Sequence, residues 1–98
     1  MSKKNGLNTA LLENGMTLQT HYENGLKSGS EIYYYSNGQK ASEGFYKNNK
    51  LEGSLTYWYE NGQKASEGFY INDKAEGVQI AWNETGQIES EQEYKNGE

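Results

Sequence analysis

Residues 35–46 read Tyr-Ser-Asn-Gly-Gln-Lys-Ala-Ser-Glu-Gly-Phe-Tyr, and residues 59–70 read Tyr-Glu-Asn-Gly-Gln-Lys-Ala-Ser-Glu-Gly-Phe-Tyr. Only the second position differs between these stretches, which lie 24 residues apart. The same interval relates three further series along the chain: Gly29, Gly53 and Gly77; Gly38, Gly62 and Gly86; and Tyr22, Tyr46, Tyr70 and Tyr94. Identity at a fixed spacing is typical of a tandem repeat protein, in which each unit packs on its neighbours.

Each repeat contains two short polar segments that favour turns between strands. The first kind is Asn14-Gly15, Asn37-Gly38, Asn61-Gly62 or Thr85-Gly86, and the second kind is Asn24-Gly25, Asn48-Asn49, Asn72-Asp73 or Asn96-Gly97. Because Asn, Asp and Gly tolerate positive φ angles, we expect two-residue type I′ turns. The cross-strand pairs that such turns predict are Gly53–Tyr70, Leu55–Gly68, Tyr57–Ser66, Trp58–Ala65, Tyr59–Lys64, Glu67–Val78 and Ala65–Ile80.

The segments between the turns are typical of β-strands. Residues 53–59, for example, read Gly-Ser-Leu-Thr-Tyr-Trp-Tyr and are rich in β-forming side chains. Glycine interrupts every stretch that could form a helix. The sequence therefore predicts an all-β fold: a single extended, twisted antiparallel meander of tandem β-hairpins with two strands per repeat and about eight strands. We expect one domain over residues 1–98, with a loose N-terminal cap at 1–12 and repeats at about 13–33, 34–57, 58–81 and 82–98.

The first repeat departs from the others in length. The interval from Gly15 to Tyr22 is one residue shorter than the interval from Gly38 to Tyr46. The last repeat is also altered, because Glu93 replaces the Phe69 of the preceding unit. Atypical terminal units are common in repeat arrays, since they contact solvent or a cap on one side.

Alternation along the strands predicts two different faces. One is a mixed-apolar face with Ile32, Tyr34, Ala41, Phe45, Trp58, Ala65, Phe69, Ile71, Val78, Ile80 and Trp82. The other is a tyrosine face with Tyr33, Tyr35, Tyr46, Leu55, Tyr57, Tyr59, Tyr70, Ile88 and Tyr94, together with Lys40 and Lys64. We expect the mixed-apolar face to be the better buried one, because it stays apolar in the third unit whereas the tyrosine face changes to Gln79, Ala81 and Asn83.

Composition and charge exclude several classes of function. The chain is acidic, with a net charge of −5, and all nine of its positive charges are lysines. The absence of Arg and the negative charge make a nucleic-acid partner improbable. There is no Cys, so neither a disulfide nor a thiolate metal site can form. No phosphate-binding loop or zinc spacing occurs.

Catalytic and metal-binding motifs are also missing. His21, the single histidine, takes the place that Phe45 and Phe69 hold in later repeats, so it fills an aromatic position. Glu43 and Glu67 recur at the repeat interval, with Glu91 as the third member, and we interpret them as a solvated or lysine-paired row flanked on the same face by Glu89 and Glu93. We therefore predict no enzyme activity, no cofactor and no metal site.

The residues of the repeat match a known family. The run Asn-Gly-Gln-Lys-Ala-Ser-Glu-Gly-Phe-Tyr, followed by Asn-Asn-Lys-Leu-Glu-Gly and Tyr-Trp-Tyr-Glu-Asn-Gly, resembles the bacterial variant of the MORN repeat, found in YwqK-like antitoxin-type proteins. The resemblance covers residues 13–98. It implies an array of β-hairpins with no enzymatic role. For MORN-type repeats in general it implies scaffolding, self-association or contact with lipid head groups, and for the YwqK-like proteins it implies neutralisation of a partner toxin.

We therefore expect a non-enzymatic protein-binding module, either antitoxin- or immunity-like or an inhibitor that occludes its partner. The predicted contact residues are five tyrosines and three glutamates: Tyr33, Tyr35, Tyr57, Tyr59, Tyr70, Glu89, Glu91 and Glu93. Tyrosine offers a rigid contact surface with a polar tip. Residues 75–98 contain six Glu and one Lys and so carry the whole net charge, which would steer a basic toxin or effector.

Three alternatives stay open at this stage. The chain could be a self-associating scaffold, including a symmetric homodimer, or a binder of membrane surfaces. It could also be an acidic decoy, of bacterial or phage origin, that occupies a nucleic-acid-binding defence or toxin protein. No signal peptide or lipid-attachment motif is recognisable, so we expect a cytoplasmic location.

Overall fold

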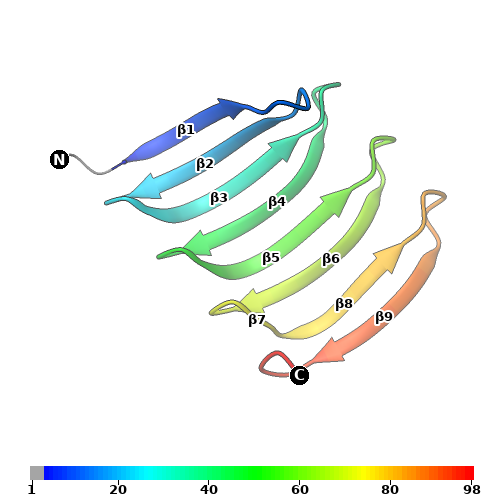
Figure 1. Ribbon diagram of the computed structural model, residues 1–98. Coiled ribbons are helices and arrows are strands. Elements are labelled where there is room, and N and C mark those ends of the chain that lie inside the picture. Colours follow the sequence, from blue (N-terminus) through cyan, green and yellow to red (C-terminus); the bar gives the residue numbers. More distant parts are fainter. Residues whose placement is uncertain (1–3) are drawn as a thin grey trace.

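The computed structural model describes residues 4–98, which form one antiparallel sheet of nine strands (Figure 1). The strands are β1 (Gly6–Leu11), β2 (Thr17–Glu23), β3 (Leu26–Tyr34), β4 (Lys40–Lys47), β5 (Lys50–Trp58), β6 (Lys64–Ile71), β7 (Lys74–Ala75), β8 (Gly77–Trp82) and β9 (Ile88–Tyr94). Their order in the sheet follows the sequence, and β7 and β8 together occupy the place of one strand beside β6. The predicted all-β meander is confirmed. Strand β1 lies within the segment expected as a cap, and the first three residues of that segment lie outside the described part.

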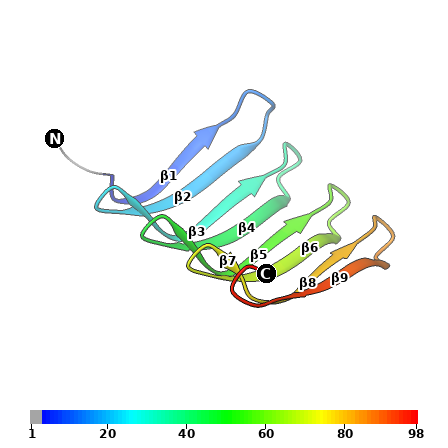
Figure 2. The same ribbon diagram turned by 60° about the horizontal axis from the view of Figure 1, so that its bottom comes forward.

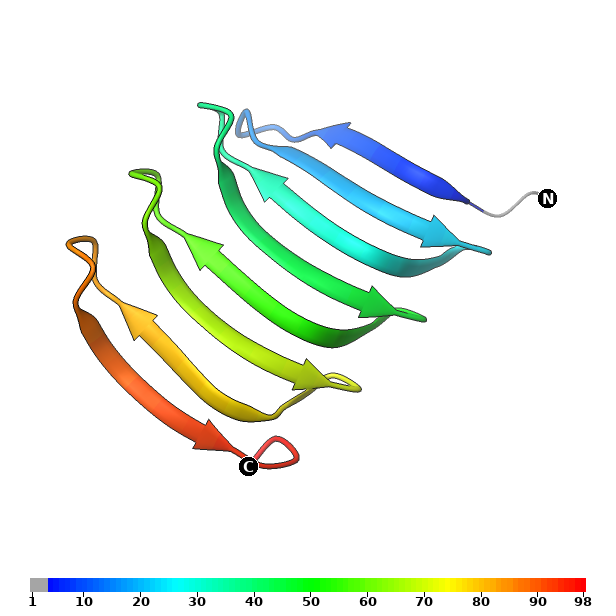
Figure 3. The same ribbon diagram turned by 180° about the vertical axis from the view of Figure 1, so that it is seen from behind.

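The sheet is a single layer. Its extents are 48 × 35 × 16 Å, and none of the described residues forms a second layer over either side (Figures 1 and 3). Within residues 4–98 there is no helix that is long and apolar enough to cross a membrane. Figure 2 shows the two kinds of connection in two rows, one along each edge formed by the strand ends.

The second kind of turn has the predicted geometry. Both central residues have positive φ in each of these turns: Asn24 and Gly25, Asn48 and Asn49, Asn72 and Asp73, and Asn96 and Gly97. This combination defines a type I′ turn, whose twist matches that of the paired strands.

The first kind of turn differs from the prediction. Only the glycines have positive φ there, and the Gly62 N–H donates to the Tyr59 carbonyl at 2.9 Å while the Tyr59 N–H donates to the Gln63 carbonyl at 2.8 Å. This pattern is a three-residue loop that begins with a type I turn. Asn61 stabilises it by accepting a hydrogen bond on its side-chain oxygen from the Gln63 N–H, at 2.9 Å.

The three-residue loop changes the strand register beside it. Tyr57 pairs with Ser66 as predicted, but Trp58 pairs with Lys64, so Ala65 is an extra residue in a β-bulge. The predicted pairs Trp58–Ala65 and Tyr59–Lys64 are wrong for this reason. The first repeat has no such bulge, because β1 and β2 pair without a shift. The missing bulge residue explains why that repeat is one residue shorter.

A second irregularity recurs at Gly29, Gly53 and Gly77, which have φ of 109°, 122° and 82°. Between β4 and β5 the register changes by two residues across this point, from Gly44–Leu55 to Tyr46–Leu51. The equivalent change beside Gly77 pairs Glu67 with Ile80, so the predicted pairs Glu67–Val78 and Ala65–Ile80 are wrong. Bulges bend strands, and the strands here are arcs (Figure 3).

Burial is greater on the tyrosine face, contrary to expectation. Thr20, Glu31, Ala41 and Ser42 are the buried side chains of this face, whereas Thr56 is the buried side chain of the other face in residues 4–98. Ala41, at 7% exposed, is the one hydrophobic side chain in residues 4–98 that is buried. The mixed-apolar face instead carries most of the exposed hydrophobic side chains, namely Leu7, Leu11, Phe45, Phe69, Ile71, Val78 and Ile88. The bend of the sheet therefore encloses the tyrosine face and opens the other.

The bulges also move individual residues between the faces. Directly paired residues share a face, so the pairs Trp58–Lys64, Tyr34–Lys40 and Trp82–Ile88 place both lysines and the isoleucine on the mixed-apolar face. The prediction that Lys40, Lys64 and Ile88 lie on the tyrosine face is wrong. Ala41 and Ala65, which were expected on the mixed-apolar face, lie among the tyrosines instead.

Candidate functional site

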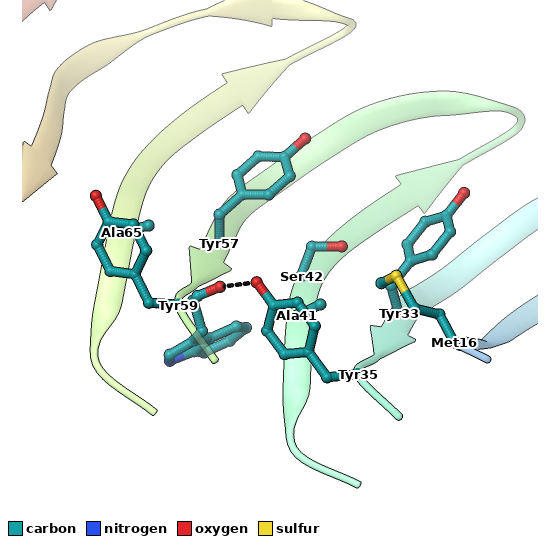
Figure 4. A pocket seen from close by; sticks show the side chains of 9 residues that line it. Met16, Tyr33, Tyr35, Ala41, Ser42, Tyr57, Tyr59 and Ala65 are labelled. Atoms are coloured by element: carbon teal, nitrogen blue, oxygen red, sulfur yellow. Dashed lines mark hydrogen bonds between the residues drawn. The ribbon is translucent and has the colours of Figure 1, made fainter. Parts of the chain in front are cut away.

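A hollow of about 560 Å³ lies on the tyrosine face and crosses strands β3 to β6 (Figure 4). We call it the tyrosine groove, and its lining residues are Met16, Tyr33, Tyr35, Ala41, Ser42, Tyr57, Trp58, Tyr59 and Ala65. None of these side chains is charged. The walls of the groove are aromatic and its smallest lining residues are alanines, so its chemistry suits an apolar or aromatic surface on a partner.

The repeat positions the groove residues in pairs. Tyr33 and Tyr57 are equivalent residues of consecutive repeats, and their rings project in the same direction from β3 and β5 (Figure 4). Tyr35 and Tyr59 form a second pair, directly after the ends of the same strands. Because the hairpins stack side by side, the two pairs line the groove in parallel rows.

The three-residue loops supply the small residues of the groove. The bulge described above follows each three-residue loop after the first, and its extra residue is alanine in two consecutive repeats, Ala41 and Ala65. Both line the groove. A larger residue at this position would fill the space between the tyrosines.

Hydrogen bonds fix one pair of tyrosines and leave the other pair available. The Tyr35 hydroxyl donates to the Trp58 carbonyl at 2.5 Å, and the Tyr59 hydroxyl donates to the Trp82 carbonyl at 2.6 Å. Within residues 4–98, no hydrogen bond occupies the hydroxyls of Tyr33 and Tyr57. Tyr57 is 47% exposed. In the groove, Tyr35 and Tyr59 are therefore held rigidly, whereas the hydroxyls of Tyr33 and Tyr57 can bond to a ligand.

Acidic loops flank the groove. The three-residue loops contain Glu13, Glu60 and Glu84 and no lysine. All three glutamates are exposed, and the ion pairs of the described residues use other carboxylates: Lys27–Glu31, Lys40–Glu43 and Lys64–Glu67. Since Glu60 directly follows Tyr59, the mouth of an uncharged groove is negatively charged.

The other end of the tyrosine face holds an ion pair beneath an aromatic ring. Lys27 bonds to Glu31 at 2.8 Å, and its ammonium lies 4.9 Å from the centre of the Tyr46 ring. Burial alone would lower the pKa of Lys27, but the hydrogen bond and charge of Glu31 raise it above its ordinary value. Burial, with the charge of Glu31, also raises the pKa of Tyr46.

The structure brings four of the eight predicted contact residues together, Tyr33, Tyr35, Tyr57 and Tyr59. Tyr70 shares their face but lies outside the groove, where it pairs with Gly53 and Ala75.

The three glutamates do not form one surface. Glu91 pairs with Ile80 and Glu93 pairs with Val78, so both lie on the mixed-apolar face. Glu89 is the extra residue of the last bulge, at the position of Ala41 and Ala65, so the expectation that it shares a face with Glu91 is wrong.

The row of glutamates at the repeat interval is largely lysine-paired. Lys40 bonds to Glu43 at 3.0 Å and Lys64 bonds to Glu67 at 3.0 Å, each within its own strand. No group of three or more His, Asp and Glu side chains in the described part of the chain could hold a metal ion. His21 contacts the backbone oxygen of Ser30 at 3.1 Å, in keeping with a packing role.

Sequence reasoning missed several groove residues. Met16 stands where later repeats have Gln39, Gln63 and Gln87, and Ser42 is a small polar residue that recurs as Ser66 and Ser90, so neither was expected to line a binding surface. Ala41 and Ala65 were assigned to the wrong face because their bulge was not foreseen. The signal that could have found the bulge is the shorter first repeat, which differs from the others by one residue just after this loop.

Comparison with known proteins identifies the repeat. A family model described as MORN repeat variant matches three consecutive segments, residues 27–48, 51–72 and 75–96, which together span about two thirds of the chain. A search of the curated proteins finds no match.

Proposed function

The chain belongs to the MORN repeat variant family, and from this membership we propose that it binds a partner protein through its tyrosine face. Repeats of this family are generally modules that bind proteins or membranes, and they are not typically catalytic. The observation that carries the proposal is the tyrosine groove, where four tyrosines of two repeats line one hollow. Tyrosines of this kind are enriched at the centres of protein interfaces.

The mechanism that we propose is occlusion. A single-layer sheet cross-linked by backbone hydrogen bonds presents a rigid surface, and a rigid surface loses little conformational entropy when it binds. An antitoxin- or immunity-like inhibitor needs no chemistry of its own, because covering the active surface of its target is sufficient. The acidic charge of residues 75–98 would speed the encounter with a basic target.

A matched pair of variants tests the surface. Tyr57 and Phe69 are both 47% exposed, but they lie on opposite faces of the sheet. We expect the tagged chain to capture a specific partner from its native source, and Tyr57→Ala combined with Tyr33→Ala to lose it. Phe69→Ala should retain the partner. Capture that survives the double substitution would contradict the proposal.

The inhibitory role has a separate test. The captured partner is expressed alone and then together with the chain in a bacterial host. We expect growth to be slowed by the partner alone and restored by co-expression with the wild-type chain, but not with the double tyrosine variant. If the partner alone does not slow growth, the chain is a binding protein with no antitoxin role.

Charge reversal tests the steering. Exchanging Glu89, Glu91 and Glu93 for lysine should slow association by about tenfold or more at low salt and weaken its dependence on salt. The dissociation rate should change little, because Glu91 and Glu93 lie on the face opposite to the groove. Unchanged association kinetics would disprove the steering.

A further inference from the structure

We propose that the tyrosine groove takes a proline-rich segment of its partner in the polyproline II conformation, with basic residues next to the prolines. The inference rests on the proposed function and adds the chemical class of the segment that is bound. Four independent features support it: the spacing of the tyrosines, the chemistry of the walls, the free hydroxyls and the charge at the mouth.

The spacing of the repeats matches the pitch of a polyproline II helix. One repeat contributes two strands, and adjacent strands lie about 4.8 Å apart, so equivalent side chains recur about every 9.6 Å across the sheet. A polyproline II helix has three residues per turn and a rise of about 3.1 Å per residue, which gives about 9.3 Å per turn. A segment that crosses the strands would therefore place one turn beside Tyr33 and the next beside Tyr57.

The walls of the groove suit proline rings. The rings of Tyr33, Tyr35, Tyr57 and Tyr59 line it, and none of the lining residues carries a charge. Grooves lined by aromatic rings recognise polyproline II segments in several unrelated domains, because such a segment is already ordered before it binds. Ala41 and Ala65 leave space between successive tyrosines, where a pyrrolidine ring could lie.

The hydroxyls of Tyr33 and Tyr57 supply the polar part of the recognition. No hydrogen bond engages either of them in the described part of the chain, whereas Tyr35 and Tyr59 are tied to backbone carbonyls. A polyproline II segment has no internal hydrogen bonds, so its carbonyl groups are free to accept. One free hydroxyl per repeat matches one turn of the ligand.

The charge and the extent of the groove define the ligand further. Glu60 stands in the loop that follows Tyr59, and Glu13 stands in the loop that precedes Met16, so the charge beside the groove calls for basic residues in the segment. In the next repeat the tyrosines are replaced by Ala81 and Asn83, so the aromatic walls span two repeats. We therefore expect about two turns of the ligand, or about six residues, to be in contact.

The test uses synthetic peptides and the full chain. The probe is a nine-residue peptide of prolines with lysines at both ends, and binding is followed by calorimetry. We expect the wild-type chain to bind it, Tyr57→Ala to weaken binding by about tenfold or more, and Phe69→Ala to leave it unchanged. Tyr57→Phe should weaken it by about threefold or more, because the ring stays but the donor is lost.

Two control peptides and one charge variant complete the test. A peptide with glycine in place of every proline keeps the charge but loses the conformation, and we expect it to bind at least about tenfold more weakly. A peptide with glutamates at its ends should also bind more weakly, and Glu60→Lys should reverse that preference whereas Glu91→Lys should not.

Three results would overturn the inference: no binding of the proline peptide, equal binding of the glycine peptide, or binding that is insensitive to Tyr57→Ala. If the proline peptide fails while the partner is still captured in a Tyr57-dependent way, the inference is wrong and the proposed function stands. If the partner capture is itself independent of Tyr57, the proposed function fails as well.

Discussion

At the scale of the residue, one amino acid performs two tasks in the groove. Tyr35 and Tyr59 donate their hydroxyl hydrogens to the carbonyls of Trp58 and Trp82, in the following repeat in each case. Tyr33 and Tyr57 stand two residues earlier in the chain, and their hydroxyls have no hydrogen bond in the described part of the chain. The first pair holds neighbouring hairpins together, and the second pair is free for a partner.

This difference predicts opposite effects of the same substitution. Tyr59→Phe should lower the free energy of unfolding by about 1 kcal/mol, because it removes a hydrogen bond and leaves the Trp82 carbonyl without its donor. Tyr57→Phe, the matched control, should leave it within about 0.5 kcal/mol of wild type. Urea denaturation followed by circular dichroism measures both. Equal effects of the two substitutions would contradict the division of roles.

The bulge glycine is the second residue with a defined role. Gly53 has a φ of 122°, and a Cβ at this position would lie 3.5 Å from the Cβ of Phe45. Gly53→Ala should therefore lower the free energy of unfolding by about 1–2 kcal/mol or more through backbone strain, since the space itself is sufficient. Ser54→Ala, one residue further along the same strand, is the control and should change it by less than about 0.5 kcal/mol. If the two variants had the same denaturation midpoint, strain at Gly53 would be ruled out.

At the scale of the element, the sequence predicts the strands and one kind of turn correctly and the other kind wrongly. The pairs Asn48-Asn49 and Asn72-Asp73 fit a type I′ turn because both residues tolerate positive φ, and the structure has that geometry. Asn61-Gly62 fits the same turn equally well on propensity alone. It forms a three-residue loop instead, with positive φ only at the glycine. Local preference cannot separate these two loops, because each places glycine at a left-handed position.

That single ambiguity accounts for the errors at the candidate site. The three-residue loops after the first are each followed by a bulge, and the bulge changes which face is occupied by the residues between it and the loop. Ala65 and Lys64 were therefore assigned to each other's faces, whereas Tyr33, Tyr57 and Tyr70 lie beyond the bulge and were assigned correctly. The rows of tyrosines could thus be predicted, but the small residues that hollow the groove between them could not.

A further prediction concerns the pair β3 and β4 and its dependence on pH. The pKa values of Lys27 and Tyr46 are both raised in the folded chain. A raised pKa means that folding favours the protonated form, so this stabilisation is complete below the unfolded pKa of about 10 and is lost as the pH rises through the folded values. The free energy of unfolding should be level up to about pH 9 and fall above about pH 10.

Glu31→Gln isolates the cause. This substitution removes the carboxylate that raises the pKa of Lys27 and contributes to that of Tyr46, so the alkaline fall should become shallower. Urea titrations at a series of pH values from about pH 8 to about pH 11 provide the comparison. A fall of the same steepness in the variant would mean that other groups cause it.

At the scale of the whole molecule, stability is distributed along the row of hairpins that forms the sheet. Each strand pairs only with its neighbours in the sheet, and the smallest extent of the bent sheet is 16 Å, so residues 4–98 enclose no shared interior. The low content of aliphatic residues follows from this architecture, because aromatic and polar side chains cover a single layer. Stability should then be close to a sum over repeats and the contacts between them.

Removal of one complete repeat tests that view. Deletion of residues 48–71 joins Lys47 to Asn72, which is equivalent to Asn48, and leaves 74 of the 98 residues. We expect a folded sheet that unfolds cooperatively, with a denaturant dependence that is smaller in proportion to its length. Deletion of residues 60–71, half a repeat, removes one strand and reverses the direction of all that follow, so it should not fold. A whole-repeat deletion without a cooperative transition would contradict the additive view.

The bonds between repeats give the row a polarity. Tyr35 and Tyr59 both reach forward to the next hairpin, and so do Asn37 and Asn61, whose side-chain amides donate to the carbonyls of Glu60 and Glu84. At the position of these tyrosines the following unit has Asn83, which turns back and accepts hydrogen bonds from Thr85 and Gln87 of its own loop. The series of forward side-chain bonds at this position therefore ends at Asn83. Copying an internal unit would lengthen this series of forward bonds, whereas a unit that follows Asn83 would lack the forward bond at this position and would depend on strand pairing.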